Sequence, residues 1–240
     1  PVARLIEGGC ASTLAFELSD GPHRIVVNCG GARMANASVP GALTEGLRTT
    51  AAHSTLVIGD SNSTAIHADG TLGRGVGEVE LSRHEGENSS RIEASHDGYA
   101  RRFGFLHRRQ IALSADGRDI RGEDMLLPAD RRRKKGGTPF AVRFHLSPRI
   151  EIAPTADGMA AFLRAPSGTV WQFRCRGCTL AIEDSVWIDG QGRPIHIAIQ
   201  RKTDHAVLSV KDQGIGIAKE HQTRIFGRFE RAISKSEISG

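Results

Sequence analysis

The feature that most constrains the fold of this chain is a series of short segments in which apolar and polar residues alternate. Alternation over about four to eight residues is typical of a half-buried strand. The segments that show it lie at residues 14–18, 24–29, 54–58, 78–82, 90–94, 105–113, 141–146, 150–152, 160–163, 170–175 and 180–182. Turn residues such as Ala115-Asp116-Gly117 separate most of them. Because helix signals are few before residue 217, this spacing predicts a mainly β protein built as a large antiparallel β-sandwich.

The composition is that of a globular protein. The chain has 240 residues, of which 39% are hydrophobic and 5% aromatic, and it contains 28 glycines. This amount of apolar material can bury a core as one large domain or two small ones. No apolar run approaches the roughly 20 residues that a membrane-spanning helix needs, so we expect no membrane span.

The formal net charge of +5 favours an anionic partner, such as an acidic polysaccharide, a nucleic acid or a membrane surface. The most basic run, at residues 131–135, must be exposed, because adjacent cations cannot share a core. It either grips a polyanion or forms a solvated hairpin loop. We favour the loop and expect no nucleic-acid partner, because no aromatic residues interleave with the cations to stack on bases. An acidic polysaccharide stays the expected partner.

Cysteines are too few for a disulfide scaffold in a chain of this length. They are Cys10, Cys29, Cys175 and Cys178. The Cys175-Arg-Gly-Cys178 pair is either half of a redox or zinc site or two incidental thiols. We favour incidental thiols, because no second pair completes a site.

The last part of the chain has a pattern of its own. An alternating strand at 206–210 leads into Asp212-x-Gly214-x-Gly216, and a helix carrying Ile-Phe-x-Arg-Phe-Glu-Arg follows. This order resembles the ATP-binding domain of sensor histidine kinases. The resemblance implies that Asp212 binds the adenine amino group, and that Gly214 and Gly216 let the backbone approach the nucleotide. It covers residues 194–240, an incomplete α/β fragment of strand, turn and helix.

The kinase-like fragment lacks two parts of the family's nucleotide site. The Asn-bearing helix that holds magnesium and phosphates should precede the strand and does not, and the second glycine-rich loop should follow residue 240. We therefore do not expect ATP or magnesium to bind. An ATP-binding signalling module is still one alternative function, and a nonfunctional chimera of two unrelated parts is another.

The larger part of the chain carries a second resemblance, which rests on an ordered set of motifs. The set includes Ala-His53-Ser-Thr and His96-Asp-Gly-Tyr99, and its members lie at residues 47–56, 73–76, 93–99, 107–109, 119–124, 171–174 and 183–187. Together they resemble the C-terminal domain of heparinase II/III-family proteins. The match covers residues 1–193, so we predict domains at 1–193 and 194–240.

The heparinase resemblance implies a polysaccharide lyase that cleaves uronate-containing glycans by β-elimination. In that family the sandwich packs against an N-terminal α/α toroid, which would be the natural packing partner here. Most catalytic groups belong to the toroid, so we expect this chain to be inactive alone and leave open whether it is an enzyme. A periplasmic or cell-envelope location is also implied.

Some relatives hold zinc in the sandwich through two histidines and an acidic residue. By resemblance, His53 and His96 are the histidines, and the acidic ligand is Asp60 or Asp69, which the sequence does not decide. Zinc accepts such nitrogen and oxygen ligands. The alternative is that both histidines are structural residues held by hydrogen bonds.

Tyr99 and His96 are the candidates for proton transfer. Tyr99 is the only tyrosine of the chain and follows His96 closely, and both side chains can exchange protons when their neighbours tune them. The alternative for Tyr99 is an aromatic residue packed at a strand edge with its hydroxyl in water.

Arginine and tryptophan side chains nearby suit a glycan as well. Guanidinium groups bind carboxylates in a bidentate manner, and the candidates are Arg101, Arg102, Arg108 and Arg109. We slightly favour the alternative, in which they form the solvent face of one strand. Trp171 either stacks on a sugar ring or belongs to the core, and its place in an alternating segment favours the core.

Overall fold

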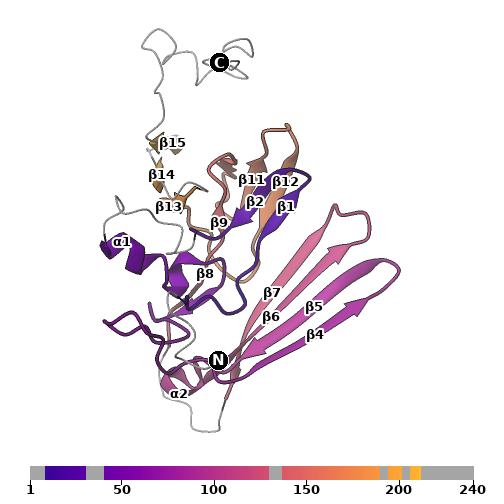
Figure 1. Cartoon of the computed structure of the whole chain (residues 1–240). Coiled ribbons are helices and arrows are strands. Elements are labelled where there is room, and N and C mark those ends of the chain that lie inside the picture. The colour runs from indigo at the N-terminus through magenta and orange to yellow at the C-terminus, as the bar shows by residue number, and fades with distance from the viewer. Residues whose placement is uncertain (1–8, 31–40, 130–136, 190–193, 202–205, 212–240) are drawn as a thin grey trace.

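A computed structural model describes residues 9–30, 41–129 and 137–189, together with the backbone of 194–201 and 206–211 (Figure 1). Every strand pair in this part of the chain is antiparallel. Helical elements are short: α1 (Gly41–Gly46), a 3-10 turn at Thr50–Ala52, and α2 (Ala100–Phe103). The prediction of a mainly β, antiparallel fold is confirmed. No helix among the described residues is long and apolar enough to cross a membrane.

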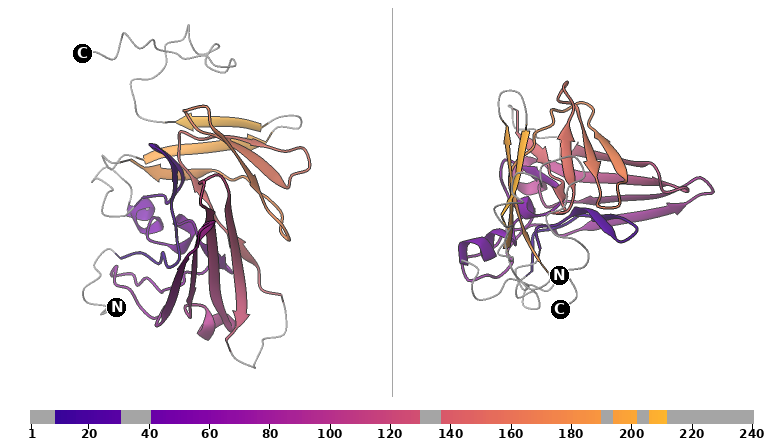
Figure 2. Two further views of the ribbon diagram at one scale, coloured as in Figure 1. Left: turned by 90° about the vertical axis from the view of Figure 1, so that its right-hand side faces the viewer. Right: turned by 90° about the horizontal axis from the view of Figure 1, so that it is seen from above.

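The longest strands form a four-stranded sheet in the order β4 (Val79–Glu85), β5 (Ser89–His96), β6 (Phe105–Ser114) and β7 (Ile120–Pro128). Figures 1 and 2 show this sheet projecting away from the smaller sheets. The strand β7 was not predicted, because a polar stretch at residues 121–124 interrupts its apolar alternation. Continuous pairing with β6 holds it in the extended conformation.

Two smaller sheets enclose the main apolar core. One has the order β1 (Leu18–Asp20), β2 (His23–Val27) and β9 (His145–Leu146), and the other runs β10 (Glu151–Pro154), β11 (Ala160–Arg164) and β12 (Val170–Arg174). The buried members of this core are Ile25, Val26, Ile150, Leu163 and Ala165.

Trp171 lies at the edge of this core, where it is partly buried. Its indole N–H donates to the Asp20 carboxylate at 3.1 Å. The preferred prediction of a core position for Trp171 is therefore confirmed.

A second core joins the four-stranded sheet to the pair β3 (Leu56–Ile58) and β8 (Phe140–Val142). Leu56, Ile58 and Tyr99 are its buried members, and side chains of β6 and β7 pack against them. Through this core, the base of the projecting sheet is fixed to the loops that carry the candidate functional residues.

The sheet β13 (Ser185–Ile188), β14 (Pro194–Arg201) and β15 (Ala206–Lys211) spans the boundary predicted at residue 193. Strand β13 pairs with β14, so the backbone hydrogen bonding continues from one predicted domain into the other. The boundary itself stays a prediction. Asp212, Gly214 and Gly216, the helix after them and the basic run at 131–135 lie outside the described residues.

Three predicted strands differ from the structure. The segment predicted at 141–146 is divided between β8 and β9, which belong to different sheets. Residues 180–182 form no strand. Most of the segment 14–18 is not a strand either, since β1 begins at Leu18. Leu14 has a φ of 59°, and its carbonyl accepts a hydrogen bond from the Arg109 side chain instead of a strand partner. A buried side chain distant in sequence thus overrides the local alternation.

Candidate functional site

His53 lines a cavity of about 530 Å³ between the segment that leads into β1, the strand β2 and the end of β13. The cavity wall also contains Arg24 and Glu17, which are exposed, and the partly buried side chains of Asn28 and Trp187. A base, a cation, an amide and an aromatic ring therefore face one space.

The His53 ring is held in one protonation state. The side chain is only 6% exposed, and burial lowers its pKa, partly offset by a backbone hydrogen bond at Thr49. Its Nδ1 lies 2.8 Å from the Thr49 carbonyl oxygen, which can only accept, so Nδ1 carries the proton. The basic nitrogen of the neutral ring is therefore Nε2, the atom that a general base needs.

Asn28 joins the cavity wall to the His53 loop. Its side-chain oxygen accepts the backbone N–H of Ser54 at 2.9 Å, and its side-chain nitrogen donates to Glu17 at 3.3 Å. These two bonds fix the amide between the residue after His53 and an acidic group of the wall.

Arg109 binds the backbone next to His53 through its guanidinium group. Its Nη1 donates to the carbonyls of Leu14 and Ser54, each at 2.8 Å. Its Nε and Nη2 bind the Asp124 carboxylate at 2.8 and 3.0 Å in a bidentate pair. Of the four arginines considered as solvent-facing or carboxylate-binding, Arg109 is buried. That prediction is wrong for this residue, because every second residue of β6 faces inward.

Asp124 also ends a chain of buried histidines. His107 Nε2 lies 2.6 Å from Asp124 Oδ1, His107 Nδ1 lies 3.2 Å from His96 Nε2, and His96 Nδ1 accepts the backbone N–H of Gly98 at 3.1 Å. These partners fix the protons: His96 donates through Nε2 to His107, and His107 donates through Nε2 to Asp124. Both rings are neutral in this arrangement.

The protonation states of the network follow from its burial. Burial and the neighbouring His107 lower the pKa of His96 to about 4. Burial raises the pKa of Asp124, but hydrogen bonds from His107 and Arg109 outweigh it and leave that pKa below its ordinary value. The network therefore holds a carboxylate, a guanidinium and two neutral imidazoles.

Tyr99 and His96 line neither of the two cavities described for this structure. Tyr99 is fully buried, and its hydroxyl donates to the Leu56 carbonyl at 2.9 Å. Burial raises its pKa to about 12. Neither observation supports the predicted proton-transfer role, and both favour packing. Sequence spacing shows that His96 and Tyr99 are close, but not that they point into the core.

The predicted zinc ligands are not brought together. No group of three or more histidine, cysteine, aspartate or glutamate residues suitable for a metal occurs among the described residues. Both nitrogens of His96 have partners. Asp69 lies on an exposed loop, where it accepts from the Thr71 N–H and hydroxyl, and Asp60 is exposed too. Thus His53, His96 and Asp69 do not fit a zinc ion here.

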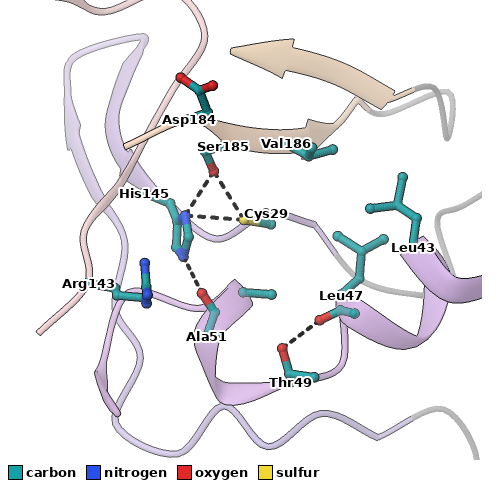
Figure 3. Close-up of a pocket in the computed structure, with 12 residues that line it drawn as sticks. Cys29, Leu43, Leu47, Thr49, Ala51, Arg143, His145, Asp184, Ser185 and Val186 are labelled. Atoms are coloured by element: carbon teal, nitrogen blue, oxygen red, sulfur yellow. Dashed lines mark hydrogen bonds between the residues drawn. The ribbon is translucent and has the colours of Figure 1, made fainter. Parts of the chain in front are cut away.

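A second cavity, of about 450 Å³, contains a cluster that the sequence did not reveal (Figure 3). Cys29 Sγ lies 3.2 Å from His145 Nδ1 and 3.6 Å from Ser185 Oγ, and the same nitrogen lies 3.1 Å from Ser185 Oγ. His145 Nε2 lies 2.9 Å from the Ala51 carbonyl oxygen. Because 116 positions separate Cys29 from His145, no local motif could have indicated this cluster.

The sequence matches a protein-family profile described as "Heparinase II/III-like, C-terminal" over residues 1–229. The matched span crosses residue 193 and includes most of the fragment that resembles a histidine kinase. It gives that resemblance, and the idea of a chimera, no support.

Two known proteins are similar to the chain. FtsZ-localized protein C of Caulobacter vibrioides is 30% identical over 210 aligned residues, and the alignment covers 79% of this chain and 34% of that protein. The crystal structure of heparinase III superposes with a TM-score of 0.56 and 13% identity, over 87% of this chain and 28% of that one. The second likeness shows the fold alone. The chain spans about a third of the length of the first protein.

Proposed function

The chain belongs to the family of heparinase II/III-like C-terminal domains, and we propose that it is the sandwich part of a polysaccharide lyase that acts on uronate-containing glycans. The observation that carries this proposal is a cavity lined by His53, Arg24 and Trp187, in which the His53 ring is neutral and keeps Nε2 as its basic nitrogen. We further propose that the cleaving enzyme includes a second domain, an α/α toroid, and that the chain alone binds glycans without cleaving them.

The cavity supplies two of the groups that a β-elimination requires, a base and a cation. The base takes the proton α to the uronate carboxyl, a carbon–carbon double bond forms, and the bond to the glycosidic oxygen breaks while an acid protonates that oxygen. We assign the base to His53 and the neutralisation of the carboxylate to Arg24, because guanidinium suits a planar carboxylate. Trp187 offers an apolar face for a sugar ring. The acid belongs to the proposed toroid.

Glycan binding tests the proposal directly. Titration calorimetry of the chain with uronate polymers and with neutral glucans should show binding to the uronate polymers only. Arg24→Gln should weaken that binding about tenfold or more, since a hydrogen bond to a charged group contributes about 1.5–3 kcal/mol. The matched control is Arg121→Gln, another exposed arginine on a strand, which lies in the projecting sheet. Equal losses in both variants, or no binding to any uronate polymer, would exclude the cavity as a glycan site.

The catalytic part needs the full-length protein. Incubated with the polymer that binds best, it should release unsaturated products, and His53→Gln should reduce their rate while leaving the binding constant within about threefold. A His53→Gln variant with normal turnover would remove His53 from the reaction.

A second candidate function rests on the relative named FtsZ-localized protein C, which is 30% identical over 210 residues. The domain would then serve localisation with FtsZ rather than glycan cleavage. A fluorescent fusion of the full-length protein distinguishes the two. Colocalisation with FtsZ that survives Arg24→Gln, without lyase activity, would favour this second function.

The cellular location follows the first proposal. A glycan lyase of this type acts in the periplasm or cell envelope, where its substrates are. Zinc is not assigned a role, since the described residues do not form a site for it.

A further inference from the structure

We propose that Cys29 and His145 form a reactive thiol site that takes a small, uncharged electrophile from the cavity shown in Figure 3. This site is separate from the proposed glycan cavity and does not depend on it. It is a cluster of a thiol, an imidazole and a hydroxyl from three strands or strand ends, all facing the same space.

The proton positions in the cluster point toward a thiol activated by a base. His145 Nε2 faces the Ala51 carbonyl oxygen at 2.9 Å, and a carbonyl can only accept, so Nε2 carries the proton. Burial lowers the pKa of His145, which keeps the ring neutral. Nδ1 is therefore the acceptor nitrogen, and it lies 3.2 Å from Cys29 Sγ and 3.1 Å from Ser185 Oγ. The imidazole is oriented by a third group, as in other nucleophile–base pairs.

Several groups can stabilise the thiolate that forms when the proton moves to His145. The Ser185 hydroxyl lies 3.6 Å from Sγ and is free to donate to it. Burial raises the pKa of Cys29, while this hydroxyl, a hydrogen bond at the Val186 backbone and the positive charge of Arg143 lower it. Arg143 also lines the cavity, and its buried Nε has no hydrogen-bond partner among the described residues.

Charged groups around the pair set its response to pH. Burial and the positive charge of Arg143 both act to lower the pKa of His145, and the same charge acts to lower that of Cys29. Arg143 is itself paired with Glu183 at 2.8 Å. The resting pair is thus a neutral thiol hydrogen-bonded to a neutral imidazole.

The walls of the cavity select the ligand. Leu43, Leu47 and Val186 supply apolar surface, and Asp184 lines one side. Transfer of a free anion or cation to such a space costs several kcal/mol, so an uncharged molecule is favoured. Cys29 is only 6% exposed, which restricts access to small ligands.

The reaction is a nucleophilic substitution at carbon, with the Cys29 sulfur as the nucleophile. With iodoacetamide as the probe, the sulfur–carbon bond forms as the carbon–iodine bond breaks, iodide leaves, and the thiol proton passes to His145 Nδ1 and then to water. No electron is gained or lost by the protein. The product is a thioether on Cys29.

The test is the pH dependence of alkylation at each cysteine, followed by mass spectrometry of the folded protein between pH 6.5 and 8.5. An ordinary thiol loses about tenfold in rate for each pH unit below its pKa, because only the thiolate reacts. Exposed Cys178 is the internal reference and should lose about a hundredfold over this range. Cys29 should change less than about threefold, because its hydrogen-bonded base accepts the proton at every pH in the range.

A variant identifies the base. His145→Gln should slow alkylation of Cys29 at pH 7 by about a hundredfold and give it the steep profile of Cys178. His84→Gln, at an exposed position of β4, is the matched control and should change nothing. If His145→Gln does not fold, the wild-type profile and the milder Ser185→Ala, with an expected several-fold loss, still decide the matter.

Three results would overturn the proposal. Cys29 could stay unmodified until the protein is unfolded, which would make it a buried structural thiol. Its rate could follow pH as steeply as that of Cys178. Finally, a folded His145→Gln variant could react at the wild-type rate.

Discussion

Two polar clusters built around histidines both bond to the loop that carries His53, and they differ in one respect. In the network of His96, His107, Asp124 and Arg109, each ring nitrogen and each carboxylate oxygen has a protein partner. In the cluster of Cys29, His145 and Ser185, the groups share one acceptor and line a cavity. We conclude that a cluster of titratable residues indicates chemistry only when one of its donors or acceptors stays within reach of a ligand.

The largest expected effect is on the stability of the fold when the network of His96, His107, Asp124 and Arg109 is broken. Asp124→Asn leaves the buried guanidinium of Arg109 without its charge partner, which typically costs about 3–5 kcal/mol of stability. Unfolding in urea measures this. The matched control is Asp119→Asn, which breaks an exposed pair with Arg121 and should cost less than about 1 kcal/mol. A loss for Asp124→Asn as small as that of the control would mean that the network does not support the fold.

The pH dependence of stability sharpens the same point. The pKa of His96 is about 4 in the folded protein, below the ordinary value of about 6.5 in the unfolded chain. Its contribution is therefore complete above about pH 6.5 and is lost as the pH falls toward 4, with a slope of about 1.4 kcal/mol per pH unit. Urea unfolding at several pH values should show this slope. In His96→Gln the slope should fall by about 1.4 kcal/mol per pH unit, which corresponds to one titrating proton. An unchanged slope would mean that a group other than His96 titrates in this range.

Removal of one hydrogen bond from the core should have a smaller effect. Tyr99→Phe leaves the Leu56 carbonyl without its donor, at an expected cost of about 1–2 kcal/mol. Lyase turnover by the full-length protein should stay within about twofold of the wild type, because Tyr99 is fully buried and lines neither of the two cavities described above. A large loss of turnover with little loss of stability would restore the catalytic role predicted from the sequence.

The smallest expected effect on the stability of the protein comes from a change in the cluster of Cys29, His145 and Ser185. Ser185→Ala removes a partly buried hydroxyl whose partners also contact one another, so the change in unfolding free energy should stay below about 1 kcal/mol. The alkylation rate of Cys29 should fall in the same variant. A destabilisation as large as that of Asp124→Asn would show that the two clusters do not differ in kind.

The sequence predicted the fold class because alternation is a local signal that sheet pairing preserves. It failed at Leu14, where the Arg109 side chain takes the backbone carbonyl, and at β7, where pairing overrides a polar stretch. The family was identified from an ordered set of motifs. The kinase resemblance rested on a short turn, and the family profile runs through that turn to residue 229.

The candidate site was less predictable than the fold. His53 was found only through the resemblance, and its cavity depends on β2 and β13, which are far apart in sequence. Tyr99 and His96 were assigned to catalysis because spacing does not show burial. The pair of Cys29 and His145 was missed because strands bring it together across 116 positions.

The most direct test of a glycan site at His53 is a nitrogen-detected NMR titration of the histidine rings in the folded chain with a uronate oligosaccharide. We expect the His53 Nε2 resonance to shift on binding, while the ring-nitrogen resonances of His96 and His107 shift by less than their line widths. The result that would contradict this is an unchanged His53 resonance, or shifts of the His96 and His107 resonances as large as that of His53. The cavity lined by His53 and the network of His96 and His107 would then not have separate roles.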